Sequence, residues 1–175
     1  MAATDVIKTA LERNWGMVDR ALEGLDDATM TRQPTSDCNS IAWLVWHMNR
    51  VVDRFINARL QSKPQLWIQD GWHTKFGMGD DPDDFGMGWS PDKVAAWSAP
   101  SREVLLGYYE AVKSGAREYL SGIADAELDK TPAPPPNQEP RSAGEMLGIM
   151  VYDNLVHGGQ IAYLRGYFRG IGWFV

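Results

Sequence analysis

The sequence is poor in cysteine and has no long hydrophobic run. Its 175 residues include a single cysteine, Cys38, so one chain cannot form an internal disulfide. No apolar stretch approaches the roughly 20 residues that a membrane-spanning helix needs. The first residues include neither a basic segment nor an apolar one, which predicts that there is no signal peptide. Together these absences favour a cytoplasmic protein that does not enter the membrane.

Positive charge is also scarce. The chain has 17 lysines and arginines against 23 aspartates and glutamates, which gives a net charge of -6 with neutral histidines. An acidic domain repels phosphate backbones, so we expect a small-molecule substrate and no nucleic-acid partner. The composition is otherwise typical of a soluble globular protein, with 44% hydrophobic and 23% charged residues. Since ordinary domains have about 100–200 residues, residues 1–175 are interpreted as a single domain.

Apolar residues recur at helical spacing in four segments, which we expect to form long helices. These segments are residues 6–25, 41–60, 101–120 and 142–169. A serine stands at the start of each of the last three, in a position typical of a helix N-cap. We find no alternation of apolar and polar residues that would indicate strands. The sequence therefore predicts an all-α protein, a four-helix bundle with one long crossover connection.

The connection between the second and third helices is long and aromatic. Residues 62–90 combine scattered glycines with many aromatic and methionine side chains. Loops of this length are uncommon inside a compact domain and are often functional. We expect the part from Trp67 to Trp89 to cover an opening in the bundle as the wall or lid of a site. Pro91 is expected to start a short helix, and the proline-rich residues 131–141 a stiff, extended connector.

Two of the three histidines stand where helices can bring them together. His157 follows Asp153 by four residues, which places both side chains on one face of the last helix. His47 lies midway along the second helix, at a depth that can face them in a bundle. Two imidazoles and one carboxylate suit Fe(II), Zn(II), Ni(II) or Mn(II) and leave coordination positions open. The alternative is that Asp153 and His157 form an ordinary surface or capping pair.

Other residues near these positions are candidates for supporting roles. Gln160 lies close after His157, where it can bond a ligand or a metal-bound water, although a solvated glutamine is an equal alternative. His73, on the aromatic loop, is a candidate general acid or base, although a lone loop histidine is more often simply exposed. Trp72 and Phe76, next to it in the sequence, are candidates for substrate contact.

Two motifs resemble those of the DinB/YfiT-like superfamily. Residues 40–48, Ser-Ile-Ala-Trp-Leu-Val-Trp-His-Met, resemble the second-helix motif of that family. Residues 157–161, His-Gly-Gly-Gln-Ile, followed by Leu-Arg-Gly at 164–166, resemble its fourth-helix motif. The resemblance spans the chain, because helix order and crossover position agree as well. It implies a four-helix bundle in up-down-down-up order that is often dimeric, and therefore a homodimer.

The resemblance also implies a divalent metal held by one side chain of the second helix and two of the fourth. Carried onto this chain, these ligands are His47, Asp153 and His157. The common pattern of the family has histidine where this chain has Asp153, which leaves the choice among Zn, Ni, Fe and Mn open. Members with an assigned activity look like metal-dependent thiol transferases or maleylpyruvate isomerases that use mycothiol, bacillithiol or glutathione.

These observations lead to the hypothesis of a metal-dependent enzyme, a thiol S-transferase or isomerase. The metal would lower the pKa of a mycothiol-type low-molecular-weight thiol, whose thiolate would attack an electrophilic small molecule. One alternative is a stress-response module of the same fold that binds a metal or small ligand without turnover. Another is a bundle whose tryptophan-rich faces, including Trp43 and Trp46, serve dimerisation.

Overall fold

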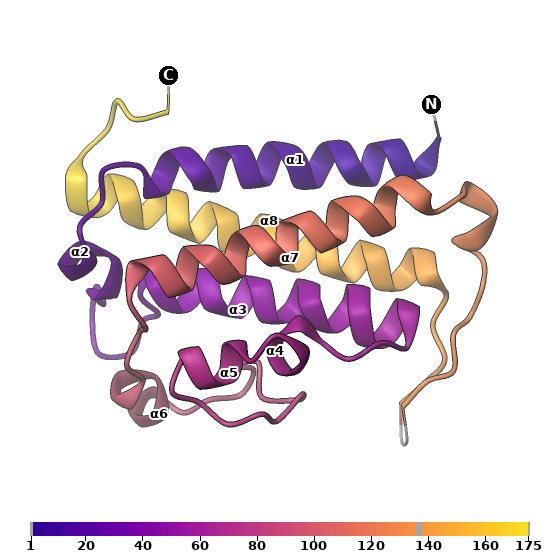
Figure 1. Cartoon of the computed structure of the whole chain (residues 1–175). Coiled ribbons are helices and arrows are strands. Elements are labelled where there is room, and N and C mark those ends of the chain that lie inside the picture. Colours follow the sequence, from indigo (N-terminus) through magenta and orange to yellow (C-terminus); the bar gives the residue numbers. More distant parts are fainter. Residues whose placement is uncertain (1, 136–137, 175) are drawn as a thin grey trace.

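Four long helices lying side by side form the body of the protein (Figure 1). The structure is a computed structural model and describes residues 2–135 and 138–174. The long helices are α1 (Ala3–Leu22), α3 (Ile41–Asp53), α7 (Arg102–Gly122) and α8 (Ala143–Arg169). In Figure 1, α1 and α8 run from right to left, whereas α3 and α7 run from left to right. The described residues form helices and turns without strands, which confirms the predicted all-α fold class.

Serine caps set where three of these helices begin. The side chains of Ser40, Ser101 and Ser142 each accept a hydrogen bond from a backbone N–H in the first turn of α3, α7 and α8. The Ser142 N–H in turn donates to Glu145, which completes a capping box. At its other end α8 stops at Gly170, whose φ of 83° is left-handed. The predicted starts of these helices are therefore confirmed.

Two helices differ from the prediction at their ends. α1 begins at Ala3 and ends at Leu22, not over residues 6–25. It starts earlier because Asp125 accepts from the N–H groups of its first residues, and it ends earlier because the chain turns at Gly24 with a φ of 68°. The continuous helix predicted over residues 41–60 changes its hydrogen-bond register after α3 and continues as a π-helix, η1 (Arg54–Leu60). Such π-helical turns are rare, and the apolar spacing of a sequence does not distinguish them from an α-helix.

The core lies between the four helices and is rich in large aromatic side chains. α1 packs on α8, and α3 packs on both α7 and α8, so that every residue of α3 is buried. Trp15, Trp46 and Tyr108 are among the largest fully buried side chains. Each such side chain removes about 150–250 Å² from water on folding. Burial of Trp43 and Trp46 contradicts the hypothesis that these two residues form a dimerisation surface.

The crossover between η1 and α7 is only partly a loop. It contains three short helices, α4 (Leu66–Gln69), α5 (Trp72–Lys75) and α6 (Pro91–Ala96), which Figure 1 places on one side of α3. The short helix predicted to start at Pro91 is thereby confirmed, whereas α4 and α5 correct the prediction of a loop over residues 62–90. Trp67 and Phe76 of this segment are buried against Tyr108 of α7. Much of the aromatic crossover therefore belongs to the core.

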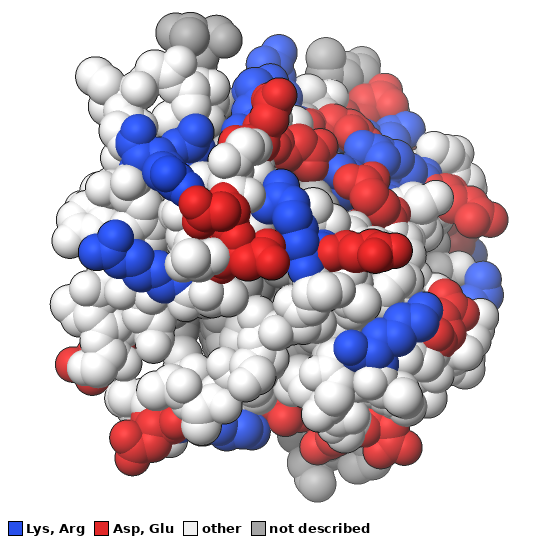
Figure 2. All heavy atoms as spheres, turned by 60° about the vertical axis from the view of Figure 1, so that its left-hand side comes forward, with Lys and Arg blue, Asp and Glu red and all other residues white. Residues whose placement is uncertain are grey.

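The remaining connections between the long helices span residues 23–40 and 123–142, and each contains one short helical segment. α2 (Asp27–Thr31) and the 3-10 turn η2 (Asp125–Glu127) interrupt segments for which no helix was predicted. The described part of the proline-rich connector has no regular secondary structure, and residues 136–137 lie outside the described residues. Acidic and basic side chains lie beside one another on the face presented in Figure 2. Among the described residues, no helix combines the length and the apolar character that crossing a membrane requires.

Candidate metal centre

His47, Asp153 and His157 meet where α3 packs on α8. His47 Nε2 lies 3.5 Å from Asp153 Oδ1, and His157 Nε2 lies 3.5 Å from the same oxygen. One ligand atom from each residue can be chosen so that all three lie within 4.8 Å of one another. Asp153 and His157 share a face of α8, as their spacing of four residues predicts. The structure therefore brings together the three side chains that the sequence singled out as a metal-binding set.

The distances from the two Nε2 atoms to Asp153 Oδ1 suit three ligands of one metal ion better than direct hydrogen bonds between these side chains. The donor–acceptor distance of an N–H···O bond is about 2.7–3.2 Å, shorter than the 3.5 Å from either Nε2 to Asp153 Oδ1. Two ligand atoms bound tetrahedrally to one ion at about 2.0–2.2 Å lie roughly 3.3–3.6 Å from each other. The distances from Asp153 Oδ1 to the two imidazole nitrogens thus match the spacing of ligand atoms around a common ion.

An oxygen acceptor holds the outer nitrogen of each imidazole. His47 Nδ1 donates to the main-chain carbonyl of Phe85, and His157 Nδ1 donates to Gln160 Oε1 at 2.7 Å. Because these oxygens accept, Nδ1 of each ring carries a proton, and Nε2, which lies toward Asp153, is the nitrogen that a neutral ring offers to a metal. Contacts of this kind fix the tautomer and the orientation of metal-ligating histidines. Gln160, a candidate for a supporting role, therefore contacts a predicted ligand directly.

Burial and mutual contacts oppose each other in setting the charges of the cluster. Burial raises the pKa of Asp153, but its contacts with His157 and His47 outweigh burial and leave that pKa below its ordinary value. Burial lowers the pKa of His157, but Asp153 and Gln160 outweigh burial and raise that pKa above its ordinary value. Asp153 Oδ2 is buried and finds no hydrogen-bond partner among the described residues. A cation would offset the unfavourable burial of this oxygen.

The cluster lies at the base of an open hollow with a volume of about 370 Å³. That volume falls in the range of small-molecule sites, about 300–1,000 Å³. Four large apolar side chains contribute to its walls: Trp43, Phe85, Met87 and Trp89. Trp43 stacks on the His47 ring with a centroid distance of 5.0 Å and an interplanar angle of 9°. Apolar walls around a few convergent polar groups are typical of sites that bind small molecules.

Gly86 allows the crossover to approach α3 at this hollow. Its φ of 91° lies in the left-handed region, which favours glycine. A Cβ atom at this position would lie 2.6 Å from the Trp43 ring and 2.9 Å from the Trp46 ring. The glycine therefore lets the main chain of residues 85–89 lie directly on the tryptophans that flank His47.

Only the last part of the predicted wall reaches the hollow. Its lining from the crossover consists of residues 85–89 and Val94 of α6, not of the whole segment from Trp67 to Trp89. The rings of Trp72 and Phe76 lie 5.5 and 5.7 Å from the ring of Tyr108, in contact with the core. His73 lies on α5 beside Thr74 and is not among the described residues that line the hollow. The structure does not bring these three candidate residues to the metal cluster.

Sequence reasoning missed Phe85, which contacts the cluster, and two buried charged residues of α3. Phe85 acts through its main-chain carbonyl, which any residue can supply, so no side-chain pattern indicates it. Arg50 and Asp53 are buried charges on α3, and Arg50 bonds the chain just before Phe85. Charged side chains are rarely buried unless they are paired. Their position in a strongly apolar helix was therefore a usable signal that the sequence analysis did not follow.

The family model described as the DinB superfamily matches residues 10–161, which include all three residues of the cluster. The chain belongs to the DinB superfamily. Among solved structures, this DinB-superfamily protein is similar to one described as the conserved protein of locus from Enterococcus faecalis. The TM-score is 0.84 at 24% sequence identity, covering 98% of this chain and 99% of that chain, which establishes a shared fold. A comparison with curated proteins finds no match.

Proposed function

We propose that this DinB-superfamily protein binds a divalent metal ion through His47, Asp153 and His157. The observation that carries the proposal is the convergence of two Nε2 atoms on Asp153 Oδ1, each at 3.5 Å. The buried Asp153 Oδ2 without a described partner and the outer contacts of both imidazoles support it. Two imidazole nitrogens and one carboxylate oxygen suit Zn, Ni, Fe or Mn and leave positions for a further ligand.

We further propose that the site catalyses thiol S-transfer or isomerisation of a small molecule. A divalent ion held there would supply Lewis-acid chemistry and lower the pKa of a mycothiol-type thiol. The thiol proton would pass to water, and the thiolate sulfur would bond to an electrophilic carbon as the bond to its leaving group, or a π-bond in an addition, breaks. Phe85, Met87 and Trp89 form apolar walls against which the apolar part of a substrate can pack. Trp43 stacks on the His47 ring and restricts its rotation. The resemblance to the superfamily motifs supports this reaction class.

Metal analysis tests the proposed ligands. Wild-type protein, expressed with added Zn, Ni, Fe and Mn, is analysed by mass spectrometry beside His157→Ala and His73→Ala. We expect about one ion per chain in the wild type and in His73→Ala, and only traces in His157→Ala. The His73 variant is the matched control, because it removes a histidine that does not line the hollow. Trace metal in all three proteins would contradict the proposal.

A binding module without turnover is the second candidate function. Among the described residues that line the hollow, the titratable side chains are those of His47, Asp153 and His157. If all three hold a metal, none is left as a separate general acid or base, and this favours binding alone. An assay with mycothiol and a panel of electrophiles separates the two functions. Turnover that disappears in His157→Ala supports the enzyme, whereas bound metal without turnover supports the module.

We also propose that two copies of the chain associate through the outer face of α8. Five apolar residues on this face are 38–71% exposed: Ile149, Tyr152, Val156, Tyr163 and Tyr167. We call them the outer stripe of α8. Between Glu145 and Arg165 the one charged residue of this helix is Asp153, which faces the metal cluster. The central part of the outer stripe is therefore uncharged, as the core of a protein–protein interface usually is.

Charge and area both favour a second copy as the partner. An antiparallel pair with its two-fold axis near Val156 places the Glu145 end of one α8 beside the Arg169 end of the other. The exposed parts of the three tyrosines alone amount to on the order of 400 Å² per copy. With its aliphatic members, the outer stripe approaches the roughly 1,200 Å² in total at which specific interfaces begin.

Sedimentation analysis tests this association. We expect the wild type to be a dimer, and Tyr163→Arg to be a monomer because it places a cation in the uncharged part of the outer stripe. Ile68→Arg is the matched control, since Ile68 is also exposed and apolar but lies on α4. A monomeric wild type, or a dimeric Tyr163→Arg, would contradict the proposed interface.

We propose that the protein works in the cytoplasm on small molecules. The single cysteine suits a reducing compartment, and the net charge of -6 is unfavourable for binding to phosphate backbones. Cell fractionation followed by immunodetection tests the location. Recovery of the protein with membranes or outside the cell would contradict it.

A further inference from the structure

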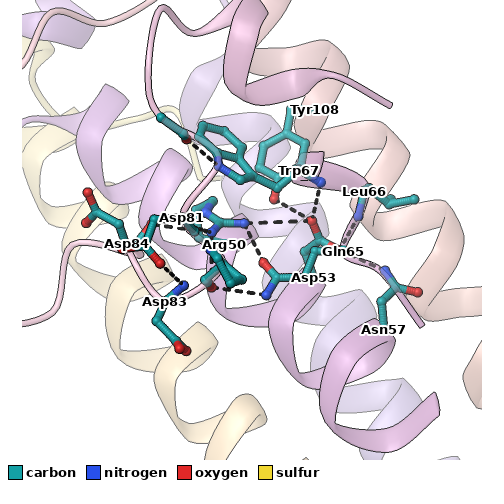
Figure 3. Close-up of polar contacts among 12 residues, drawn as sticks. Arg50, Asp53, Asn57, Gln65, Leu66, Trp67, Asp81, Asp83, Asp84 and Tyr108 are labelled. Carbon is teal, nitrogen blue, oxygen red and sulfur yellow. Dashed lines mark hydrogen bonds and ion pairs between the residues drawn. The ribbon is translucent and has the colours of Figure 1, made fainter. Parts of the chain in front are cut away.

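Arg50 lies at the centre of a polar network that attaches the crossover to α3 (Figure 3). Its side chain is completely buried. Arg50 follows His47 by three residues, so the two side chains leave neighbouring positions on α3. Burying a guanidinium is unfavourable unless its donors are satisfied. The groups that satisfy those donors therefore indicate what the residue does.

Main-chain carbonyls of one short stretch accept most of the hydrogen bonds from Arg50. Nη2 donates to the carbonyls of Asp81, Pro82 and Asp84 at 3.2, 3.3 and 3.3 Å, and Nε donates to that of Asp84 at 3.3 Å. Nη1 donates to Gln65 Oε1 at 2.7 Å. The planar guanidinium thus binds three carbonyls of residues 81–84 and one side chain at the start of the crossover.

The start of the crossover is attached to α3 by a second buried residue. Asp53 accepts hydrogen bonds from the N–H groups of Leu66 and Trp67 at 2.9 and 2.8 Å. Gln65 Nε2 donates to the carbonyl of Pro82 at 3.0 Å and so joins the two ends of the segment. Asp53 therefore fixes residues 66–67, while Arg50 fixes residues 81–84. Without the contacts of Arg50, the bonds from the Leu66 and Trp67 N–H groups to Asp53 would still attach the start of the crossover.

The residue that follows this stretch contacts the metal cluster. The carbonyl of Phe85 accepts the hydrogen bond from His47 Nδ1, and the carbonyl of the preceding Asp84 accepts from Arg50. Peptide planarity and the fixed spacing of about 3.8 Å between consecutive Cα atoms restrict how far one carbonyl can move while its neighbour is held. The main chain thereby connects the guanidinium of Arg50 to the imidazole of His47.

We propose that Arg50 is a positioning residue for the metal centre. By holding residues 81–84 it places the Phe85 carbonyl, which keeps the His47 ring in its Nδ1–H form with Nε2 directed at Asp153. The metal in this inference rests on the proposed function, whereas the state of the ring does not. Filling space alone would not need a guanidinium, because an apolar side chain fills a core with less desolvation. A lysine ammonium is a compact donor that lacks the planar fork needed to serve these acceptors together.

The test compares Arg50→Lys with Arg54→Lys, the matched control. Arg54 also contacts the crossover, but through an ion pair with the exposed Asp83 at 2.8 Å. Nitrogen-15 NMR of the metal-free protein reports the tautomer of His47, and competition titration reports its affinity for Zn²⁺. We expect the Nδ1–H form in the wild type and in Arg54→Lys, with similar Zn²⁺ affinity. In Arg50→Lys we expect a mixture of tautomers and an affinity about 10–100-fold lower.

Each outcome decides the inference. An unchanged tautomer and an unchanged Zn²⁺ affinity in folded Arg50→Lys would overturn it and leave the metal site standing. If the wild type binds none of Zn²⁺, Ni²⁺, Fe²⁺ and Mn²⁺, the proposed function fails, but the tautomer comparison still decides the role of Arg50. If circular dichroism shows that Arg50→Lys does not fold, Gln65→Met takes its place. That variant removes one acceptor of Arg50 and the bond to Pro82, and an unchanged His47 ring in it would also overturn the inference.

Discussion

Gly158 of α8 lies directly against the side chain of Asn14 of α1. A Cβ atom at Gly158 would lie 2.1 Å from Asn14 Oδ1. The same asparagine donates from Nδ2 to the carbonyl of Asn154 at 2.9 Å, so it is held in place across the helix interface. The glycine next to His157 therefore has a packing reason, which is the close approach of α1 to α8 beside the metal cluster.

Alanine at Gly158 should destabilise the protein, whereas alanine at Gly159 should not. A side chain at Gly158 overpacks the interface, and we expect a loss of about 1–3 kcal/mol in the free energy of unfolding. A Cβ at Gly159 meets nothing within 4 Å, so the better helix propensity of alanine should add up to about 1 kcal/mol. Urea denaturation measures both variants. Equal effects at the two positions would show that the contact with Asn14 is unimportant.

Replacement of Gln160 by alanine should weaken metal binding without unfolding α8. The variant removes the acceptor of the His157 Nδ1 proton, and lost outer contacts of this kind reduce metal affinity about 10–100-fold. The affinity for Zn²⁺ is measured by competition titration, with Gln69→Ala on α4 as the control. Wild-type affinity in Gln160→Ala would mean that this glutamine does not support the ligand.

Asp53 should contribute more to stability than its partner Tyr108. Asp53 accepts hydrogen bonds from the N–H groups of Leu66 and Trp67, from the Tyr108 hydroxyl and from Asn57. Burial and the nearby Asp53 raise the pKa of Tyr108, which keeps its hydroxyl protonated as a donor. Asp53→Ala leaves several buried donors without an acceptor and should cost about 3–5 kcal/mol. Tyr108→Phe loses one bond and should cost about 1 kcal/mol. Chemical denaturation checks the order, which a reversed result would contradict.

Asp125 should stabilise the start of α1 in a pH-dependent way. Its carboxylate accepts from the Ala3 and Thr4 N–H groups and from the Thr4 hydroxyl, and the backbone bonds from Thr4 and Ala3 lower its pKa. A lowered folded-state pKa adds stability above the ordinary value of 3.8, and this stability is lost as the pH falls through the folded-state value. At neutral pH the free energy of unfolding of the wild type should therefore be larger than that of Asp125→Asn. The difference between the two proteins should become smaller as the pH is lowered. A difference that is independent of pH would exclude this role.

The helices and the cluster were predictable because their signals are local or periodic. Ser142 and Glu145 form the capping box that marks the start of α8, and they lie within four residues of sequence. The spacing of Asp153 and His157 places both on one helical face. The depth of His47 followed from its position midway along its own helix, as that of His157 followed from its position midway along α8. These features depend on the period of the α-helix, which the sequence displays directly.

The crossover was less predictable because its contacts are distant in sequence and involve the main chain. Trp67 and Phe76 pack on Tyr108, a residue of another helix. The glycines around them interrupt the helical spacing of apolar residues, so the short helices α4 and α5 are not evident from the sequence. Arg50 binds carbonyl oxygens, which carry no residue identity. Hydropathy therefore indicated that this segment packs on something, but not which part enters the core and which part reaches His47.

The two helices that supply the cluster are separated by most of the chain, since His47 lies on α3 and Asp153 on α8. An ion shared by these residues would act as a removable cross-link that exists only in the folded protein. Its contribution to folding would grow with free ion concentration as RT ln(1 + [ion]/Kd). Cellular levels of the protein would then follow the supply of that ion, because a less stable chain is degraded faster.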